Sequence, residues 1–142
     1  MKIFIPGEPV AQPRHNFRVI KSGGRFICKP YIKSDHPIHA FKEAVQLAFK
    51  QAGGKMHEGP VGLTIMCIFP RPKSHSKKRS SKMEWKPSKP DSDNLGKSIL
   101  DALNKIAYAD DSQVVCLTVK KMFAFDGMNP GVSVAITKEI IV

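Results

Sequence analysis

Apolar and polar positions alternate along the chain in short runs that predict a domain of mixed strands and helices. Runs rich in β-branched and aromatic residues predict strands at residues 2–5, 17–20, 25–29, 61–69, 113–123 and 132–141. Between the second and third runs, Lys21-Ser22-Gly23-Gly24 suits a hairpin turn. The run 61–69 is apolar on both faces, which predicts a central strand covered on both sides.

Two segments repeat apolar residues every three or four positions, which is the spacing of an amphipathic helix. The first runs from residue 36 to about residue 52, and Asp35 is its expected N-cap. The second runs from residue 94 to about residue 104. Its polar stripe consists of Asp93, Lys97, Asp101 and Asn104. Together with the strands, these helices predict a small α/β or α+β fold with a mixed sheet of about five strands.

Length and cysteine content bound the class of protein. At 142 residues the chain fits one domain, residues 1–142, because one core serves about 100–200 residues. Cys28, Cys67 and Cys116 form no CxxC pair, so reduced thiols in a cytoplasmic protein are expected. The N-terminal apolar run is too short for a signal peptide, and no run reaches the length of a membrane span. A soluble protein without a membrane partner is therefore expected.

Positive charge is concentrated in one segment. The chain has 23 Lys and Arg against 12 Asp and Glu, which gives a net charge of +11 and a pI near 9.8. Residues 71–90 hold eight basic residues and one acidic residue, so they carry +7 of that charge. With Pro and Ser throughout, this segment is predicted to be an exposed, mobile loop. Such a loop can follow a phosphate backbone. The candidate DNA-binding residues are Arg14, Lys73, Lys77, Lys78, Arg79, Lys82, Lys86 and Lys89.

Trp85 is the single tryptophan and lies inside this polar segment. It could stack on a base or wedge between base pairs. It could also fix the loop to the domain, which is the interpretation that we favour, because the segment offers it little local core.

The acidic residues gather directly after the basic segment. Five of the 12 lie between Asp91 and Asp111: the two pairs Asp91/Asp93 and Asp110/Asp111, with Asp101 between them. Alone, the first pair suits a helix N-cap and the second suits a turn before a strand. Carboxylates held together raise one another's pKa unless a cation neutralises them. A site for a hard cation such as Mg²⁺, beside a phosphate-attracting loop, explains both features at once.

Lys97 lies one helical turn after Asp93, so the two side chains share a face. One interpretation is a surface ladder Asp93–Lys97–Asp101 that stabilises the helix by a few tenths of a kcal/mol, roughly. The other places the ammonium group against a scissile phosphate, where it would stabilise charge in the transition state. The spacing alone favours neither.

Taken together, residues 89–115, KPDSDNLGKSILDALNKIAYADDSQVV, resemble the RusA family of Holliday junction resolvases. The matching features are DxDN, a Lys three residues after the Asn, LDAL, and DD followed by SQV. Residues 7–14 also resemble the start of that family. The resemblance implies a homodimeric, Mg²⁺-dependent endonuclease, with Mn²⁺ able to substitute and no organic cofactor. Its partner would be four-way junction DNA, cut by paired symmetric nicks during phage or prophage recombination or DNA repair.

By position, the resemblance makes Asp91, Asp93 and Asp111 the metal-binding and catalytic carboxylates. Lys97 becomes the catalytic lysine that neutralises charge on the phosphate. Asp110 and Asp101 are expected to support the metal ligands rather than to bind the ion. Mg²⁺ would polarise the phosphodiester and lower the pKa of a bound water for in-line attack.

Chain length limits how these carboxylates can meet. A helix over 94–104 is roughly 16 Å long. The seven residues 105–111 span at most about 23–25 Å when extended. Asp111 can therefore reach the site of its own chain only if the connection doubles back along the helix; otherwise the partner subunit supplies it. We favour the same-chain arrangement because the span just suffices.

Two rival functions use the same residues. A non-catalytic basic nucleic-acid-binding module would use residues 71–90 for binding, while the Asp residues only cap and turn the chain. A Mg²⁺ enzyme that acts on a small phosphate ester is the second rival, and it leaves the basic segment without a role. Cleavage of branched DNA with Mg²⁺, and its loss in Asp91→Asn, distinguishes the endonuclease from both.

Overall fold

The computed structural model describes residues 1–140 and confirms a small α+β domain. Its four-stranded sheet has the order β1 (Lys2–Pro6), β6 (Gly131–Thr137), β4 (Val61–Phe69) and β5 (Val114–Phe123). β6 runs antiparallel to both of its neighbours, whereas β4 and β5 are parallel. The sheet is therefore mixed, as predicted, and the apolar run β4 is one of its two central strands.

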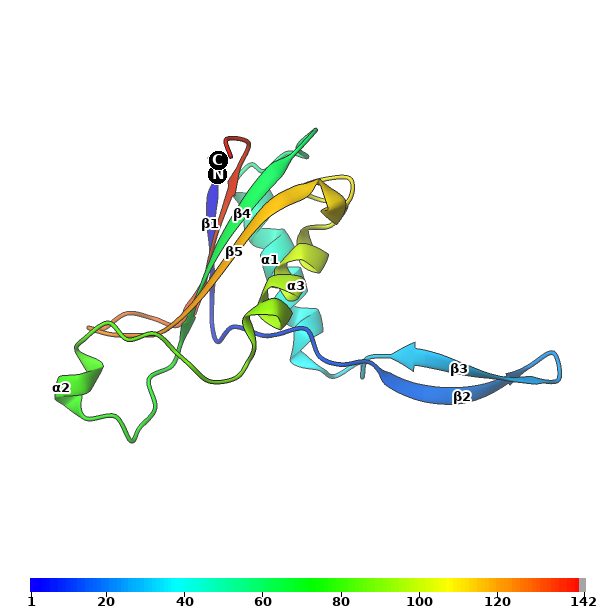
Figure 1. Cartoon of the computed structure of the whole chain (residues 1–142), viewed down its shortest axis with the longest axis horizontal. Coiled ribbons are helices and arrows are strands. Elements are labelled where there is room, and N and C mark those ends of the chain that lie inside the picture. Colours follow the sequence, from blue (N-terminus) through cyan, green and yellow to red (C-terminus); the bar gives the residue numbers. More distant parts are fainter. Residues whose placement is uncertain (141–142) are drawn as a thin grey trace.

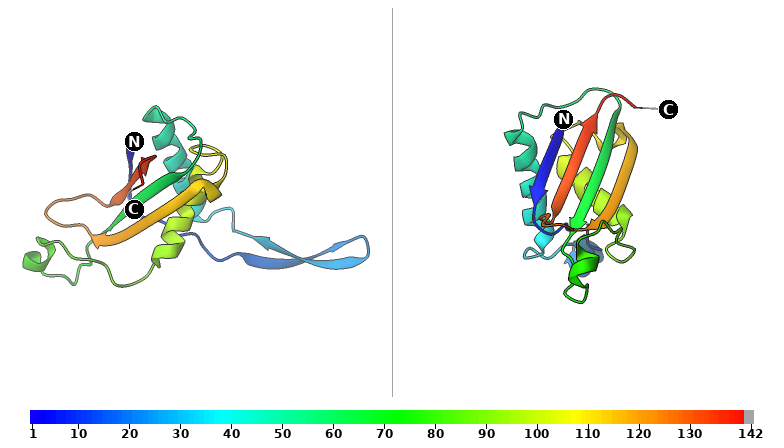
Figure 2. Two further views of the ribbon diagram at one scale, coloured as in Figure 1. Left: turned by 45° about the horizontal axis from the view of Figure 1, so that its top comes forward. Right: turned by 90° about the vertical axis from the view of Figure 1, so that its left-hand side faces the viewer.

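Both long helices lie on one face of this sheet (Figures 1 and 2). The prediction that β4 is covered on both faces is wrong, because Leu63 and Ile65 are buried while Thr64 is exposed. The apolar residues on the other face of β4 are explained by a separate, local cluster. Ile68 packs with Met122 and Ala124 in a second, smaller cluster at the carboxyl end of β4 and β5.

The first long helix, α1, spans Pro37–Gln51 and buries Ile38, Phe41, Val45 and Phe49. Its N-cap is His36, whose Nδ1 accepts a hydrogen bond from the Ile38 amide at 3.0 Å. The prediction that Asp35 caps this helix is therefore wrong. Pro37 occupies the first helical position, where its missing N–H costs nothing, and His36 is left as the residue that flanks the helix.

The second long helix, α3, spans Ser92–Leu103, so it begins two residues earlier than predicted. Leu95, Ile99 and Leu103 are buried in the core. Gly96 lets α3 approach β5 closely, because a Cβ atom there would lie 3.2 Å from side-chain atoms of both Leu117 and Val119. The helix is thus held directly against the edge strand that follows it in the chain.

The predicted hairpin forms, but as a sheet of its own. β2 (Asn16–Ser22) pairs with β3 (Arg25–Tyr31) and projects from the body of the domain (Figure 1). Gly23 and Gly24 have φ of +59° and +77°, which suits the two-residue turn between twisted strands. The mixed sheet therefore has four strands rather than about five.

The basic segment is exposed, as predicted, but it has regular structure that its composition did not indicate. It contains α2, a four-residue helix (Lys77–Ser80) capped by Ser76. Arg79 Nη2 contacts Glu84 Oε2 at 2.7 Å, and Arg71 Nη1 contacts Glu84 Oε1 at 3.1 Å. The mobility of the segment stays a prediction.

Trp85 joins the basic segment to β5 through its backbone. An isolated bridge pairs Trp85 with Met122, and the flanking hydrogen bonds are Lys86 N to Lys121 O and Phe123 N to Glu84 O, each 3.0 Å long. The Trp85 side chain is 54% exposed. The main chain at Trp85 therefore attaches the segment to the domain, and the indole stays accessible from solvent.

The remaining elements differ from the predictions at their ends. A short 3-10 turn, η1 (Asp111–Gln113), precedes β5. β6 ends at Thr137, and the predicted end of that strand at residue 141 lies outside the described residues. The three cysteines are free thiols. None of the helices in residues 1–140 is both long enough and apolar enough to cross a lipid bilayer.

Candidate functional site

The first turn of α3 presents two exposed carboxylates. Asp91 is the N-cap residue by backbone conformation, yet its side chain accepts no capping hydrogen bond. Asp93 lies in the first turn, where its Oδ1 accepts a hydrogen bond from the Asn94 amide at 2.9 Å. Capping therefore does not occupy the Asp91 carboxylate, which leaves its oxygens available to a ligand.

The chain before Asp91 is held by β5. Lys121 Nζ donates to the carbonyl oxygens of Ser88 and Pro90, each at 2.8 Å. Lys121 was not among the predicted site residues. A signal was present, however, because by register it occupies the helix-facing side of β5, where Leu117 and Val119 are apolar.

The N-terminal segment lies beside the same turn. The amide of Gln12 donates to the Asn94 carbonyl at 2.9 Å. This hydrogen bond holds the residues after Gln12 beside the start of α3. Arg14 thereby joins Lys89, Pro90, Asp91 and Asn94 in lining a pocket of about 540 Å³. Two predicted DNA-binding cations, Arg14 and Lys89, thus flank one predicted metal ligand.

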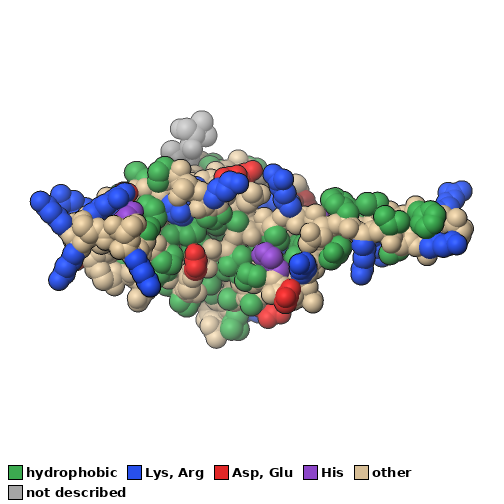
Figure 3. All heavy atoms as spheres, turned by 90° about the horizontal axis from the view of Figure 1, so that it is seen from below, with side chains coloured by type: hydrophobic (Ala, Val, Ile, Leu, Met, Phe, Trp, Pro, Cys, Tyr) green, Lys and Arg blue, Asp and Glu red, His purple; other side chains and the backbone are tan. Residues whose placement is uncertain are grey.

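The rest of the predicted DNA-binding residues extend away from this pocket. Lys86 and Lys89 line an adjoining pocket of about 630 Å³, and Lys86 Nζ lies 5.3 Å from the ring centres of Phe69 and Phe123. Arg79 is engaged by Glu84, as described above. Lys73, Lys77, Lys78 and Lys82 are exposed. Basic side chains gather over this end of the molecule (Figure 3).

Lys97 lies on the exposed face of α3 between Asp93 and Asp101. Its Nζ is 4.0 Å from Asp101 Oδ2, and Lys42 Nζ from α1 is 3.8 Å from the same oxygen. The surface ladder is therefore present between Lys97 and Asp101. An exposed pair at this distance contributes only about 0.3–0.5 kcal/mol. Lys97, whose side chain is 57% exposed, can therefore leave its pair with Asp101 at little cost in free energy.

The two residues of the second acidic pair, Asp110 and Asp111, have different roles. Asp110 caps η1, because its Oδ2 accepts from the Ser112 amide at 3.0 Å and Gln113 Oε1 accepts from the Asp110 amide at 3.2 Å. The hydrogen bonds from Ser112 lower the pKa of Asp110. The structural interpretation of Asp110 as a turn residue is thus confirmed, and Asp111 is the member of the pair that remains outside the cap.

Asp111 lies near the carboxyl end of α3. The connection after α3 turns back at Lys105, which has φ of +64°, and Tyr108 donates from its hydroxyl to the Leu100 carbonyl at 2.9 Å. Burial raises the pKa of Tyr108, and the nearby carboxylates of Asp111 and Asp101 raise it further. The Tyr108 side chain therefore lies against the last turn of α3, where both Asp101 and Asp111 are close enough to influence its hydroxyl.

This position separates Asp111 from the first acidic pair. Pro90, which precedes Asp91, contacts Lys121 near the end of β5, whereas Asp111 precedes the beginning of that strand at Val114. Seven strand residues correspond to about 23 Å. No group of three or more His, Cys, Asp or Glu that could hold a metal ion is found in residues 1–140. In the described chain, Asp111 therefore lies at the other end of β5 from Asp91, and the structure does not bring together the three carboxylates of the favoured same-chain site.

The carboxylates at the start of α3 nevertheless suit a hard cation. Mg²⁺ is commonly held by one or two carboxylates, with waters and phosphate oxygens in its other positions. Asp91 and Asp93 offer two carboxylates in an exposed place, beside cations that attract phosphate. The start of α3 thus combines carboxylates that can hold a divalent ion with cations that can attract a phosphate.

Comparison with known proteins identifies the family. The family described as Endodeoxyribonuclease RusA matches residues 6–137. YqaN of Bacillus subtilis (strain 168), named as an uncharacterized protein, is 38% identical over 133 residues, which is 87% of this chain and 88% of that protein. Crossover junction endodeoxyribonuclease RusA of Lactococcus phage r1t is 50% identical over 40 residues, 28% of this chain and 30% of that protein. The chain belongs to the RusA family, a family of Holliday junction resolvases.

Proposed function

We propose that this chain is a Mg²⁺-dependent endodeoxyribonuclease that resolves four-way DNA junctions by paired symmetric nicks, with Mn²⁺ able to substitute. The observation that carries the proposal is the Asp91 carboxylate, which caps no helix amide and shares a pocket with Arg14 and Lys89. A residue that served only as a cap would bond to the helix amides. A carboxylate between two cations suits a metal ion that is approached by a phosphate.

Each side chain then has a distinct task. Arg14 and Lys89 bind the phosphate backbone on either side of the cut. Asp91 and Asp93 hold the cation, which when bound polarises the phosphodiester and supplies a nucleophilic water for in-line attack. Lys97 leaves its weak pairing with Asp101 and neutralises charge that develops on the phosphate. Lys121 keeps the main chain before Asp91 in place.

Asp111 enters this proposal from the partner subunit of a homodimer. Its own chain keeps it at the opposite end of β5 from Pro90, so a second copy is the direct way to bring it to Asp91 and Asp93. The edge strand β5 supports such a dimer, because Val115 and Leu117 are 59% and 42% exposed there. A two-fold dimer also suits the two symmetry-related strands of a junction.

The test is nicking of a labelled four-way junction with Mg²⁺, scored strand by strand, beside a linear duplex of the same sequence. Wild type should nick the junction on two symmetric strands, and Asp91→Asn should bind it but not cut it. Asp126→Asn is the control, since Asp126 is exposed, lies in a turn away from α3, and has φ of +49°, which Asn tolerates.

Equal cutting by wild type and Asp91→Asn would end the proposed mechanism. Binding by every protein with no nick under Mg²⁺ or Mn²⁺ would instead support a non-catalytic nucleic-acid-binding module.

A further inference from the structure

The hairpin β2–β3 has two chemically different faces. Directly opposed residues of an antiparallel pair point to the same side. The pairs Phe17–Pro30, Val19–Cys28 and Lys21–Phe26 therefore form one face, which is mostly apolar. The pairs Arg18–Lys29, Ile20–Ile27 and Ser22–Arg25 lie on the other, which is basic along its edges.

The apolar face is unpartnered in the single chain. Phe17, Val19 and Phe26 are 66%, 67% and 77% exposed, and none of them belongs to the core of the domain. The hairpin projects away from the helices (Figure 1). Figure 3 shows apolar side chains along its length and cations at its tip. A two-stranded hairpin gains little stability by itself in water, so this face is suited to contact with something else.

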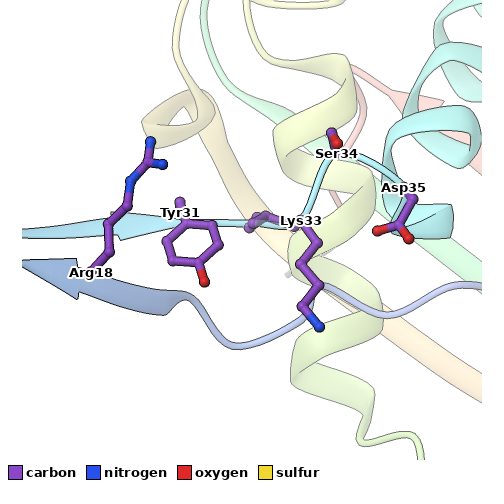
Figure 4. Close-up of a pocket in the computed structure, with 6 residues that line it drawn as sticks. Arg18, Tyr31, Lys33, Ser34 and Asp35 are labelled. Carbon is purple, nitrogen blue, oxygen red and sulfur yellow. The ribbon is translucent and has the colours of Figure 1, made fainter.

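The charge of the hairpin limits what that contact can be. Residues 9–34 contain six Lys and Arg and no Asp or Glu. At its base, the Arg18 guanidinium lies 5.2 Å from the centre of the Tyr31 ring, and both line a pocket of about 550 Å³ with Lys33 (Figure 4). Two copies packed through this hairpin would bring like charges together, whereas a polyanion would neutralise them.

We infer that the hairpin β2–β3 is a second DNA-binding arm, which contacts phosphates through Arg18, Arg25 and Lys29 and stacks Phe26 and Phe17 on bases exposed at the branch point. The inference rests on the proposed function for its class of ligand. Exposed aromatic side chains stack on unpaired bases or wedge between base pairs that are already strained. In an open four-way junction the base pairs that flank the branch point have lost stacking on one side, and in an intact duplex they have not.

Four variants test this arm. Phe17→Ala/Phe26→Ala removes the rings and Arg18→Gln/Lys29→Gln removes two charges. Their controls change the same residue classes on the far part of α1 and after it: Leu47→Ala, which is 55% exposed, and Lys50→Gln/Lys55→Gln. Affinity is measured by fluorescence anisotropy of a labelled junction and of the matched duplex, with Ca²⁺ in place of Mg²⁺ so that no cutting occurs.

The aromatic variant should bind the junction about fivefold or more weakly and the duplex almost unchanged, since one lost stack removes roughly that much affinity. The charge variant should bind both the junction and the duplex more weakly. The slope of log affinity against log salt should also fall by about 2. 2-Aminopurine at the branch point should lose its quenching in the aromatic variant only. Far-UV circular dichroism and the unfolding midpoint should match wild type in all four variants, because every substituted side chain is exposed.

Wild-type affinity in both hairpin variants would overturn the inference. If the same proteins still nick the junction with Mg²⁺, the proposed endonuclease stands without this arm. If sedimentation shows that the aromatic variant has become monomeric, the apolar face belongs to a second copy of the chain and the inference also fails. Absence of both binding and nicking in wild type would instead remove the proposed function.

Discussion

Lys121 offers a direct test of how the chain positions Asp91. Its ammonium group donates at 2.8 Å to the carbonyl oxygens of Ser88 and Pro90, immediately before the carboxylate. Lys121→Met keeps most of the side-chain length and the strand position while removing both hydrogen bonds. We expect this variant to fold and to bind a junction, but to nick it more slowly, because Asp91 is no longer held in place.

The size of the effect follows from the two contacts. A hydrogen bond from a charged donor contributes about 1.5–3 kcal/mol net. The contact with Ser88 is exposed and that with Pro90 is partly buried, so we count only the second in full. If that stabilisation acts entirely on the position of Asp91 in the transition state, its loss slows nicking by about ten- to a hundredfold.

Single-turnover nicking of a labelled junction with Mg²⁺ measures this rate, and anisotropy with Ca²⁺ measures affinity. Lys121→Arg should restore part of the rate, since it can still donate to both carbonyls. Lys120→Met is the control, because Lys120 is the exposed neighbour on the opposite face of β5. A wild-type rate in Lys121→Met, or the same loss in Lys120→Met, would refute the positioning role. A loss of affinity without a change in rate would assign Lys121 to DNA binding instead.

Two further predictions follow from the acidic residues. The hydrogen bond from Arg79 lowers the pKa of Glu84 from 4.5 to about 2, so the stabilisation by Glu84 is present above pH 4.5 and is lost as pH falls towards 2. The difference in unfolding free energy between wild type and Glu84→Gln should shrink over that range, and a constant difference would contradict the ion pair. Mixing Asp91→Asn with Asp111→Asn subunits should restore a nick in one strand of each junction, because a mixed dimer with shared sites keeps one complete site. If subunit exchange is confirmed and no nick is restored, Asp111 acts in the site of its own chain.

Local sequence pattern predicted the elements whose sequence signals are local. The apolar spacing of α1 and α3 and the glycine turn of the hairpin indicated those elements with errors of one or two residues at their ends. The cap of α1 was missed because Asp is the stronger general N-cap, while here Pro37 follows His36 and fixes the boundary there.

The order in residues 71–90 depends on contacts that no local pattern reveals. Arg71 and Arg79 meet Glu84, and the main chain at Trp85 pairs with Met122, a residue 37 positions further along. Composition indicated only that the segment would be polar and exposed. Its attachment to β5 came from the partner strand rather than from its own sequence.

The carboxylates illustrate the same limit in the site itself. Chain length allowed Asp111 to reach Asp91, since the connecting residues were just long enough when extended. The parallel pairing of β4 with β5 removes that freedom, because it directs β5 back along α3 with its beginning beside the end of the helix. Which strands pair, and in which direction, is a tertiary property. The candidate ligands could therefore be chosen from the sequence, but their arrangement could not.

The separation of the two acidic groups also bears on why cutting would depend on a branched substrate. The first turn of α3 lies between two basic projections, the α2 segment and the hairpin (Figure 1). Phosphate contacts from both hold DNA without reading its sequence. Neither projection, however, completes the metal ligands that we propose. If a second subunit supplies Asp111, cleavage requires a ligand that both copies can hold at once, and a branched junction meets that requirement better than a straight duplex.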